Sequence, residues 1–165
     1  TPKPSSAASD VYKRQVLNRY TFKSRCEKMN ITKESDYAIR AVLILAKNSE
    51  KYILDAKTIC ELGNIPLRFL LKLLRKLIKS GIIKSYRGVN GGYSLAKAPI
   101  DINLRNIIES IEGPITINRC LYDKDACSAG KGDNCAIHAA LYNVQSKMIS
   151  ELEKVNFEDL KRNKW

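Results

Sequence analysis

Residues 66–96, PLRFLLKLLRKLIKSGIIKSYRGVNGGYSLA, decide the fold. The first half predicts an amphipathic helix that begins at Pro66 and is closed by Gly81. The second half predicts a β-hairpin, because two β-rich pieces flank RGVNGG, whose glycines and Asn90 tolerate the positive φ of a tight turn. A helix followed directly by a hairpin indicates a winged helix-turn-helix. The expected apolar stripe of the helix consists of Leu67, Leu70, Leu74, Leu77 and Ile78.

Two shorter helices are predicted before this stretch. Apolar side chains recur at helical spacing after Thr32, and either Thr32 or Ser35 can cap the first turn. Asp55 can cap a second helix, AKTICELG, which Gly63 ends before a turn at residues 64–65. Its inward-facing residues are expected to be Ile59, Cys60 and Leu62. The winged helix-turn-helix domain is therefore predicted to span residues 29–98.

The cationic side chains of the third helix share one face. A charged face is often merely solvated, but two helices before it and a hairpin after it favour contact with DNA. Arg68 stands at the end of the helix that normally meets base edges, where its guanidinium can engage guanine. Leu71 is expected near the reading face, either against a thymine methyl group or simply packed. The cationic face consists of Arg68, Lys72, Arg75 and Lys79.

Phosphate contacts are expected around this reading helix. Lys72, one turn beyond Arg68, is a further DNA-binding candidate. Arg87 at the base of the hairpin can enter a minor groove or meet phosphates. The other predicted phosphate contacts are Lys57 and Thr58 of the second helix and Arg75, Lys76 and Lys79 of the third.

Composition supports an anionic partner. The chain has 165 residues, with 29 Lys and Arg against 17 Asp and Glu, which gives a net charge of +12. Such a charge suits nucleic acid or an anionic membrane surface, although it can also serve solubility alone. No apolar run approaches the length of a membrane span, and five cysteines, an odd number, argue against a secreted disulfide framework. A cytoplasmic protein is expected.

Residues 1–28 are interpreted as a leader outside the fold. They show no sustained apolar period, and SSAASDVYKRQ resembles a translated sequencing adapter. We expect this leader to be non-native and disordered, with Met29 as the natural start. The alternative is a basic arm that touches DNA phosphates.

Three cysteines and the only histidine of the chain fall in CLYDKDACSAGKGDNCAIH: Cys120, Cys127, Cys135 and His138. Thiolates and imidazole bind soft or borderline metals. The cysteines are separated by six and seven residues, unlike the paired C-x2-C spacing of structural zinc. Iron–sulfur clusters tolerate longer separations. The spacing alone leaves open an iron–sulfur cluster, zinc, a redox-active disulfide or ordinary loop cysteines.

The C-terminal part of the chain is expected to contain a connecting helix, a cluster-binding loop and a dimerisation helix. Residues 99–117 predict a connecting helix, residues 118–136 a cluster-binding loop, and residues 137–165 a dimerisation helix and tail. The dimerisation seam is expected from apolar residues three and four positions apart, although they can also pack on the chain's own core. These residues are Leu141, Val144, Met148, Leu152 and Val155.

Four stretches together carry a resemblance to a known family: ITKESDYAIRAVLILA, the IP-x-x-FL-x-x-LL-x-x-L helix, IIKSYRGVNGGYSLA, and the cysteine loop ending in C-x-x-H. In these stretches, which cover most of residues 29–155, the chain resembles the IscR/NsrR family of bacterial winged-helix transcriptional regulators. The resemblance implies a homodimer that binds palindromic double-stranded DNA operators and carries one iron–sulfur cluster per protomer. It also implies that Cys120, Cys127 and Cys135 are ligands of that cluster.

The same resemblance offers two fourth ligands. IscR-like proteins hold a [2Fe–2S] cluster with a histidine that matches His138. NsrR-like proteins hold a [4Fe–4S] cluster with an aspartate that matches Asp36 and comes from the partner subunit. We expect His138 and [2Fe–2S], because the C-x-x-H placement matches and Asp36 also suits a helix start. Two departures are the longer cysteine spacing and Leu71, where IscR-like proteins carry a glutamate.

The sequence as a whole predicts a mainly α protein with a small β-hairpin wing, a winged helix-turn-helix and a long C-terminal dimerisation helix. The expected function is a DNA-binding transcriptional regulator, a repressor, whose cluster senses cluster supply, redox state or nitric oxide. The alternative is a metal-free winged-helix regulator that responds to a small molecule or to thiol oxidation. An enzyme is not expected, because Cys135 and His138 lack an orienting carboxylate and an oxyanion loop.

Overall fold

The computed structural model describes residues 31–48, 53–123, 127, 130 and 134–164. The chain divides into two units, Thr1–Asn30 and Ile31–Trp165, and every described residue belongs to the second. The predicted leader, residues 1–28, lies outside the described residues.

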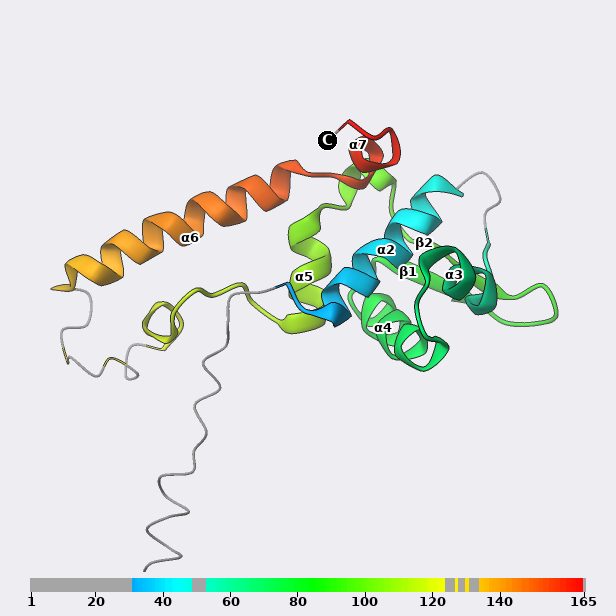
Figure 1. Cartoon of the computed structure of the whole chain (residues 1–165), viewed down its shortest axis with the longest axis horizontal. Helices are drawn as coiled ribbons and strands as arrows, with labels where there is room; N and C mark the ends of the chain where they lie inside the picture. Colours follow the sequence, from blue (N-terminus) through cyan, green and yellow to red (C-terminus); the bar gives the residue numbers. More distant parts are fainter. Residues whose placement is uncertain (1–30, 49–52, 124–126, 128–129, 131–133, 165) are drawn as a thin grey trace, which may run out of the picture. The chain divides into compact units, whose positions relative to one another are not determined.

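The second unit is mainly helical with one two-stranded sheet (Figure 1). The strands are antiparallel, in a register that pairs Ile83 with Leu95 and Tyr86 with Gly92. This architecture confirms the predicted fold class. The elements are α2 (Lys33–Lys47), α3 (Ala56–Gly63), α4 (Leu67–Lys79), β1 (Ile83–Tyr86), β2 (Gly92–Leu95), η2 (Pro99–Asp101), α5 (Leu104–Glu112), η3 (Arg119–Leu121), α6 (Ala136–Lys154) and α7 (Phe157–Lys161).

The first helices begin where their capping residues stand. The Thr32 hydroxyl accepts a hydrogen bond from the Ser35 amide at 3.3 Å, and Asp55 accepts from the amides of Lys57 and Thr58 at 2.8 and 3.0 Å. Asn64, with φ of 48°, makes the left-handed turn between α3 and α4. These predicted boundaries are confirmed, except that Pro66 is the N-cap of α4 rather than its first helical residue.

The core is formed mainly by α2, α4 and α5, with smaller contributions from α3, β1 and α7. On α4 the fully buried residues are Leu70, Leu73, Leu74 and Leu77. The predicted apolar stripe was partly wrong: Leu67 and Ile78 are exposed, and Leu73 is buried. The reason is helical geometry, since Leu73 lies three and four residues from Leu70 and Leu77, at the centre of the buried face. Leu62 of α3, expected to face inward, is exposed as well.

The chain returns to this core after α6. Phe157 of α7 is fully buried, its amide donates to the Ile102 carbonyl at 2.9 Å, and the Leu104 amide donates to the Val155 carbonyl at 3.1 Å. The core therefore takes in residues well beyond the predicted domain boundary at residue 98, including part of the segment expected to be a tail. We call α2, α3, α4, the β1–β2 wing, α5 and α7 together the head.

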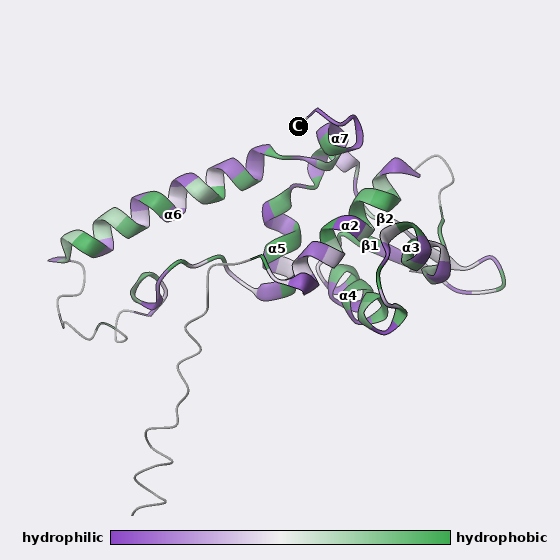
Figure 2. Ribbon diagram, in the orientation of Figure 1, coloured by the Kyte–Doolittle hydropathy of each residue, from purple (hydrophilic) through white to green (hydrophobic). Residues whose placement is uncertain are grey.

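The long helix α6 has 19 residues and buries none of them. Apolar residues alternate with polar ones along it (Figure 2). Two polar links join it to the rest of the unit: Arg105 of α5 pairs with Glu153 at 2.5 Å, and the Gln145 side chain accepts from the Ile117 amide at 3.0 Å. In the part of the chain that the structure describes, no helix is both long enough and apolar enough to cross a membrane.

Candidate nucleic-acid interface and cysteine segment

The outward face of α4 carries the predicted cationic side chains. Arg68, Arg75 and Lys79 are exposed, on the side of the helix opposite Leu70 and Leu77. They lie on one side of the helix at spacings of seven and four residues, which gives the helix a row of positive charge. Such a row on the second helix of a helix-turn-helix is the arrangement that contacts DNA.

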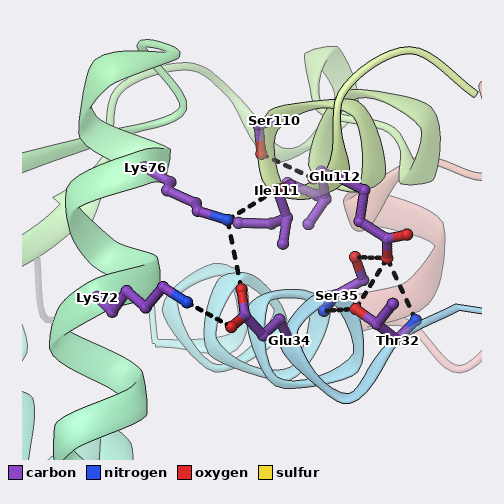
Figure 3. Close-up of polar contacts among 9 residues, drawn as sticks. Thr32, Glu34, Ser35, Lys72, Lys76, Ser110, Ile111 and Glu112 are labelled. Carbon is purple, nitrogen blue, oxygen red and sulfur yellow. Dashed lines mark hydrogen bonds and ion pairs between the residues drawn. The ribbon is translucent and has the colours of Figure 1, made fainter. Parts of the chain in front are cut away.

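Lys72 and Lys76 turn toward α2 instead (Figure 3). The Lys72 Nζ lies 2.5 Å from Oε1 of Glu34, and the Lys76 Nζ lies 3.3 Å from Oε2 of the same carboxylate. These lysines hold the pKa of Glu34 below its ordinary value, with the hydrogen bond from Lys72 as the largest cause. Lys76 also donates to the Ile111 carbonyl at 2.8 Å.

Lys76 therefore differs from the other predicted phosphate contacts. Its ammonium group is shared between the Glu34 carboxylate of α2 and a carbonyl in the last turn of α5. A cation at a helix C-terminus satisfies carbonyls that have no partner within the helix and complements the helix dipole. In this conformation Lys76 positions α4 against two neighbouring helices rather than facing outward.

The last turn of α5 is fastened to α2 by a second carboxylate. Oε1 of Glu112 accepts hydrogen bonds from the Thr32 amide at 3.2 Å, from the Thr32 hydroxyl at 3.0 Å and from the Ser35 hydroxyl (Figure 3). Ser35 is fully buried, so this bond satisfies a hydroxyl that water does not reach. Sequence reasoning missed Glu34, Glu112 and Ser35 in this network, since their partners lie 38 to 80 residues away in the chain.

The wing and α3 present the remaining candidates. Arg87 is exposed directly after β1, in a turn where the Gly91 amide donates to the Gly88 carbonyl at 3.0 Å. Lys57 is exposed at the start of α3. The Thr58 hydroxyl donates to the Asp55 carboxylate at 2.6 Å, and this bond is the largest cause of the lowered pKa of Asp55. Thr58 thus serves the helix cap, and only its remaining exposed surface can face a phosphate.

The cysteines lie between α5 and α6, in residues 113–135, which we call the cysteine segment. It begins at Gly113, whose φ of 91° and ψ of −170° belong to a region that glycine alone adopts readily. Cys120 is in η3, and its amide donates to the Asn118 side chain at 3.4 Å. Cys135 is the N-cap of α6, and His138 follows in the first turn.

The structure does not bring the predicted ligands together. Within the described ranges, which include Cys120, Cys127, Cys135 and His138, no three His, Cys, Asp or Glu side chains are close enough to share a metal ion. All three cysteines are half-buried. The donor set, three thiols and one imidazole, still fits an iron–sulfur cluster by its chemistry.

Asp36, the alternative ligand, is engaged within its own helix. Its carboxylate forms a two-point ion pair with Arg40, in which Nε lies 3.2 Å from Oδ1. Arg40 also lies 5.3 Å above the Tyr37 ring and donates to the Gly63 carbonyl at 3.4 Å. The ion pair raises the pKa of the Arg40 guanidinium. Asp36 could bind a metal only after exchanging this partner.

A compact helical head with an exposed cationic helix and a β-hairpin wing defines the class of winged-helix transcriptional regulators. A family model described as "Rrf2: Iron-dependent Transcriptional regulator" matches residues 31–163. The chain therefore belongs to the Rrf2 family, which includes the IscR proteins that its sequence resembles.

Individual relatives agree with this assignment. The HTH-type transcriptional regulator IscR of Xenorhabdus nematophila is 30% identical over 135 residues, which cover 82% of this chain and 80% of the relative. The solved structure of T. potens IscR matches with a TM-score of 0.64 at 23% identity, over 82% of this chain and 88% of that one. CymR (YrzC), the global cysteine regulator of B. subtilis, matches with a TM-score of 0.60 at 28% identity, over 81% and 97%.

The relatives are transcriptional regulators, so the predicted regulatory class is confirmed and an enzyme is excluded, as expected. Membership in this family implies DNA binding. The identities of the phosphate-contacting residues, of the cluster ligands and of the dimer interface stay predictions.

Proposed function

We propose that the protein is a homodimeric repressor whose binding to a palindromic operator is controlled by an iron–sulfur cluster held in the cysteine segment. The observation that carries the proposal is the exposed cationic row of α4, flanked by α3 and by a wing with an exposed arginine. In this assignment Arg68 reads a base edge, and Arg75, Lys79, Lys57 and Arg87 contact phosphates. Lys72, exposed apart from its ion pair with Glu34, joins them when phosphate replaces that carboxylate.

The cluster ligands are proposed from donor chemistry and from the family. Cys120, Cys127 and Cys135 supply thiolates, and His138 supplies the fourth ligand of a [2Fe–2S] cluster, in preference to Asp36 and [4Fe–4S]. When bound, such a cluster supplies a centre that reacts with oxidants and nitric oxide. The donors do not form a common site among the described residues, so loading would have to bring Cys120, Cys127 and Cys135 together.

The partner subunit is proposed to pack on α6. This helix buries none of its residues, and Ile137 and Val144 are 69% and 56% exposed. They lie on the same side of the helix as Leu141, Met148, Leu152 and Val155. Pairing two copies along this seam would remove the apolar side chains from water and set two reading helices roughly 34 Å apart.

The cysteine segment is proposed to transmit the signal, because it joins the head to the dimerisation helix. Its first residue follows the turn of α5 that Lys76 and Glu112 fasten to α4 and α2. A change in the conformation of the segment can thus alter both the spacing of the two heads and the position of α4. A loss of only a few kcal/mol in operator affinity is enough for a switch.

The decisive experiment is anaerobic reconstitution with iron and sulfide, followed by absorption spectroscopy and operator binding on the same samples. We expect a cluster chromophore in the wild type and its loss in Cys120→Ala, Cys127→Ala and Cys135→Ala, together with altered operator affinity. Cys60→Ala is the matched control, because this half-buried thiol of α3 lies outside the segment. Three segment variants that keep the wild-type chromophore and affinity would refute the proposal.

The second candidate is a metal-free regulator of the same family. It is favoured by the separation of the four donors in the described structure and by a 28% identical relative that is named a cysteine regulator. A colourless anaerobic preparation that binds no iron yet binds DNA, with an affinity that changes on thiol oxidation, identifies this candidate.

A further inference from the structure

The outward side of α4 carries an apolar row beside the cationic one. Leu67, Leu71 and Ile78 fall within about 40° of one another around the helix, next to the sector of Arg68 and Arg75. All three are exposed, with Leu67 at 50%, Leu71 at 37% and Ile78 at 36%. Aliphatic side chains exposed among cations on a reading helix have an unfavourable contact with water that a ligand can remove.

This row lies on the flank of α4 that faces away from α2. On the opposite flank Phe69 packs against the Tyr37 ring, with centroids 6.3 Å apart, and Lys76 pairs with Glu34. The protein's own packing therefore occupies one flank of the reading helix. The other flank, with Leu67 and Leu71 near the N-terminal end of the helix, is left exposed.

The positive charge of the neighbouring row indicates which kind of molecule binds the exposed apolar row. The exposed cations Arg68, Arg75 and Lys79 favour a polyanion, and a major groove is a polyanionic surface wide enough for a helix. Within that groove the C5-methyl group of thymine is the apolar feature, and contact with aliphatic side chains is a known way of reading it.

We propose that Leu71, with Leu67 beside it, selects operators by packing against thymine C5-methyl groups; this rests on the proposed DNA-reading function. Arg68 and Leu71 are three residues apart, or about 4.5 Å along the helix axis. The recognised thymine then lies about one or two base pairs from the base pair that Arg68 reads. Ile78 belongs to the same row but stands roughly 10 Å further along the helix, beyond the residues that normally meet base edges.

Uracil tests this proposal, because it lacks only the methyl group and keeps the hydrogen-bonding edges of thymine. The full-length protein first selects duplexes from a random DNA library, and the best duplex is the probe. Each thymine of one half-site is then replaced singly by deoxyuridine, and affinity is measured at fixed salt concentration. We expect at least one replacement to weaken wild-type binding about four-fold, which corresponds to the about 0.8 kcal/mol of one buried methyl group.

The same duplexes are then bound to Leu71→Ala, Leu67→Ala and the matched control Ile78→Ala. The control removes a side chain of the same exposure from the same row. We expect Leu71→Ala to bind the thymine and uracil duplexes alike, Leu67→Ala to show reduced discrimination, and Ile78→Ala to discriminate as the wild type does.

Three results overturn the inference. If the wild type binds every uracil-substituted duplex as tightly as the thymine duplex, no methyl group is read. Discrimination that survives in both leucine variants, or disappears in Ile78→Ala instead, assigns the methyl contact to other residues. Failure of the wild type to enrich any duplex removes the DNA-reading function itself, and only in that case do both proposals fall together.

Discussion

The head and the α6 helix differ in how much of their apolar surface is buried. In the head, residues from α2, α4, α5 and α7 enclose one another, and Leu70, Leu73, Leu77 and Phe157 are inaccessible to water. In α6 none of the 19 residues is buried, although apolar side chains recur along the helix. The head therefore completes its own core, whereas α6 presents a surface that a second copy can complete.

The largest expected effect concerns the head. Leu73→Ala leaves a cavity at the centre of the buried face of α4, so the free energy of unfolding should fall by about 2–5 kcal/mol in chemical denaturation. Leu71→Ala, two residues away but exposed, is the control and should cost less than about 1 kcal/mol. Equal losses in the two variants would mean that the face of α4 that contains Leu73 is not buried.

The next effect concerns the proposed dimer. Val144→Asp places a charge on the exposed apolar side of α6, and burying that charge in a helix pair is costly, so the dimer should dissociate about 100-fold more readily. Sedimentation equilibrium measures this change. Ser146→Asp adds the same charge about 200° around the helix and should leave the dimer intact. If both variants remain dimeric, the partner packs elsewhere.

A smaller effect separates the two candidate fourth ligands, His138 in the first turn of α6 and Asp36 in α2 of the head. His138→Ala should alter the absorption spectrum and shorten the lifetime of a reconstituted cluster at least about ten-fold, since even outer-shell partners of metal ligands are worth that much. Asp36→Ala should leave the spectrum unchanged, because the Asp36 carboxylate is already paired with Arg40. The opposite pattern would assign the ligand to the first helix of the head.

The smallest effect concerns the Glu34 network within the head. The pKa of Glu34 is lowered from 4.5, so the stability that its ion pairs contribute is present above pH 4.5 and is lost as the pH falls through the folded-state pKa. Glu34→Gln should lower the free energy of unfolding by about 0.5–1 kcal/mol at pH 7. It should not change this free energy once wild-type Glu34 is protonated. Thermal unfolding at several pH values measures the difference.

Glu151→Gln is the control for this charge change. Glu151 pairs with Lys154 at 2.7 Å on α6, but both side chains are well exposed, so solvent screens the pair. We expect a smaller effect than at Glu34 at every pH. If Glu34→Gln still lowers the free energy of unfolding at a pH at which wild-type Glu34 is protonated, the Glu34 side chain acts by packing rather than by charge.

The fold was largely predictable because its signals are local. The capping residues Thr32 and Asp55, the turn at Asn64 and the glycine-rich hairpin each lie within a few residues of the structure they determine. The return of Phe157 to the core was not predictable in this way. Its packing depends on Ile102 and α2, more than 50 residues earlier, and α7 has only 5 residues in which to show a period.

The candidate site was predictable in its residue types but not in its contacts. The helical spacing of apolar and cationic residues along α4 correctly placed Arg68, Arg75 and Lys79 on the exposed face, since helical periodicity determines the face of each residue. The same periodicity could not show that Lys76 is turned to α5, because its partners belong to other helices. The cysteines were evident from the sequence, but a loop has no period from which the positions of their side chains can be predicted.

Gly113 has a consequence for how this chain tolerates insertions. The cysteine segment leaves α5 through a single residue in a conformation that suits glycine, and a side chain there would meet no atom within 4 Å. Because closing a longer loop costs only about 0.6 kcal/mol for each doubling of its length, residues can be added between the cysteines at little expense. The spacing of six and seven residues between the cysteines of this chain is therefore compatible with an unaltered DNA-reading head.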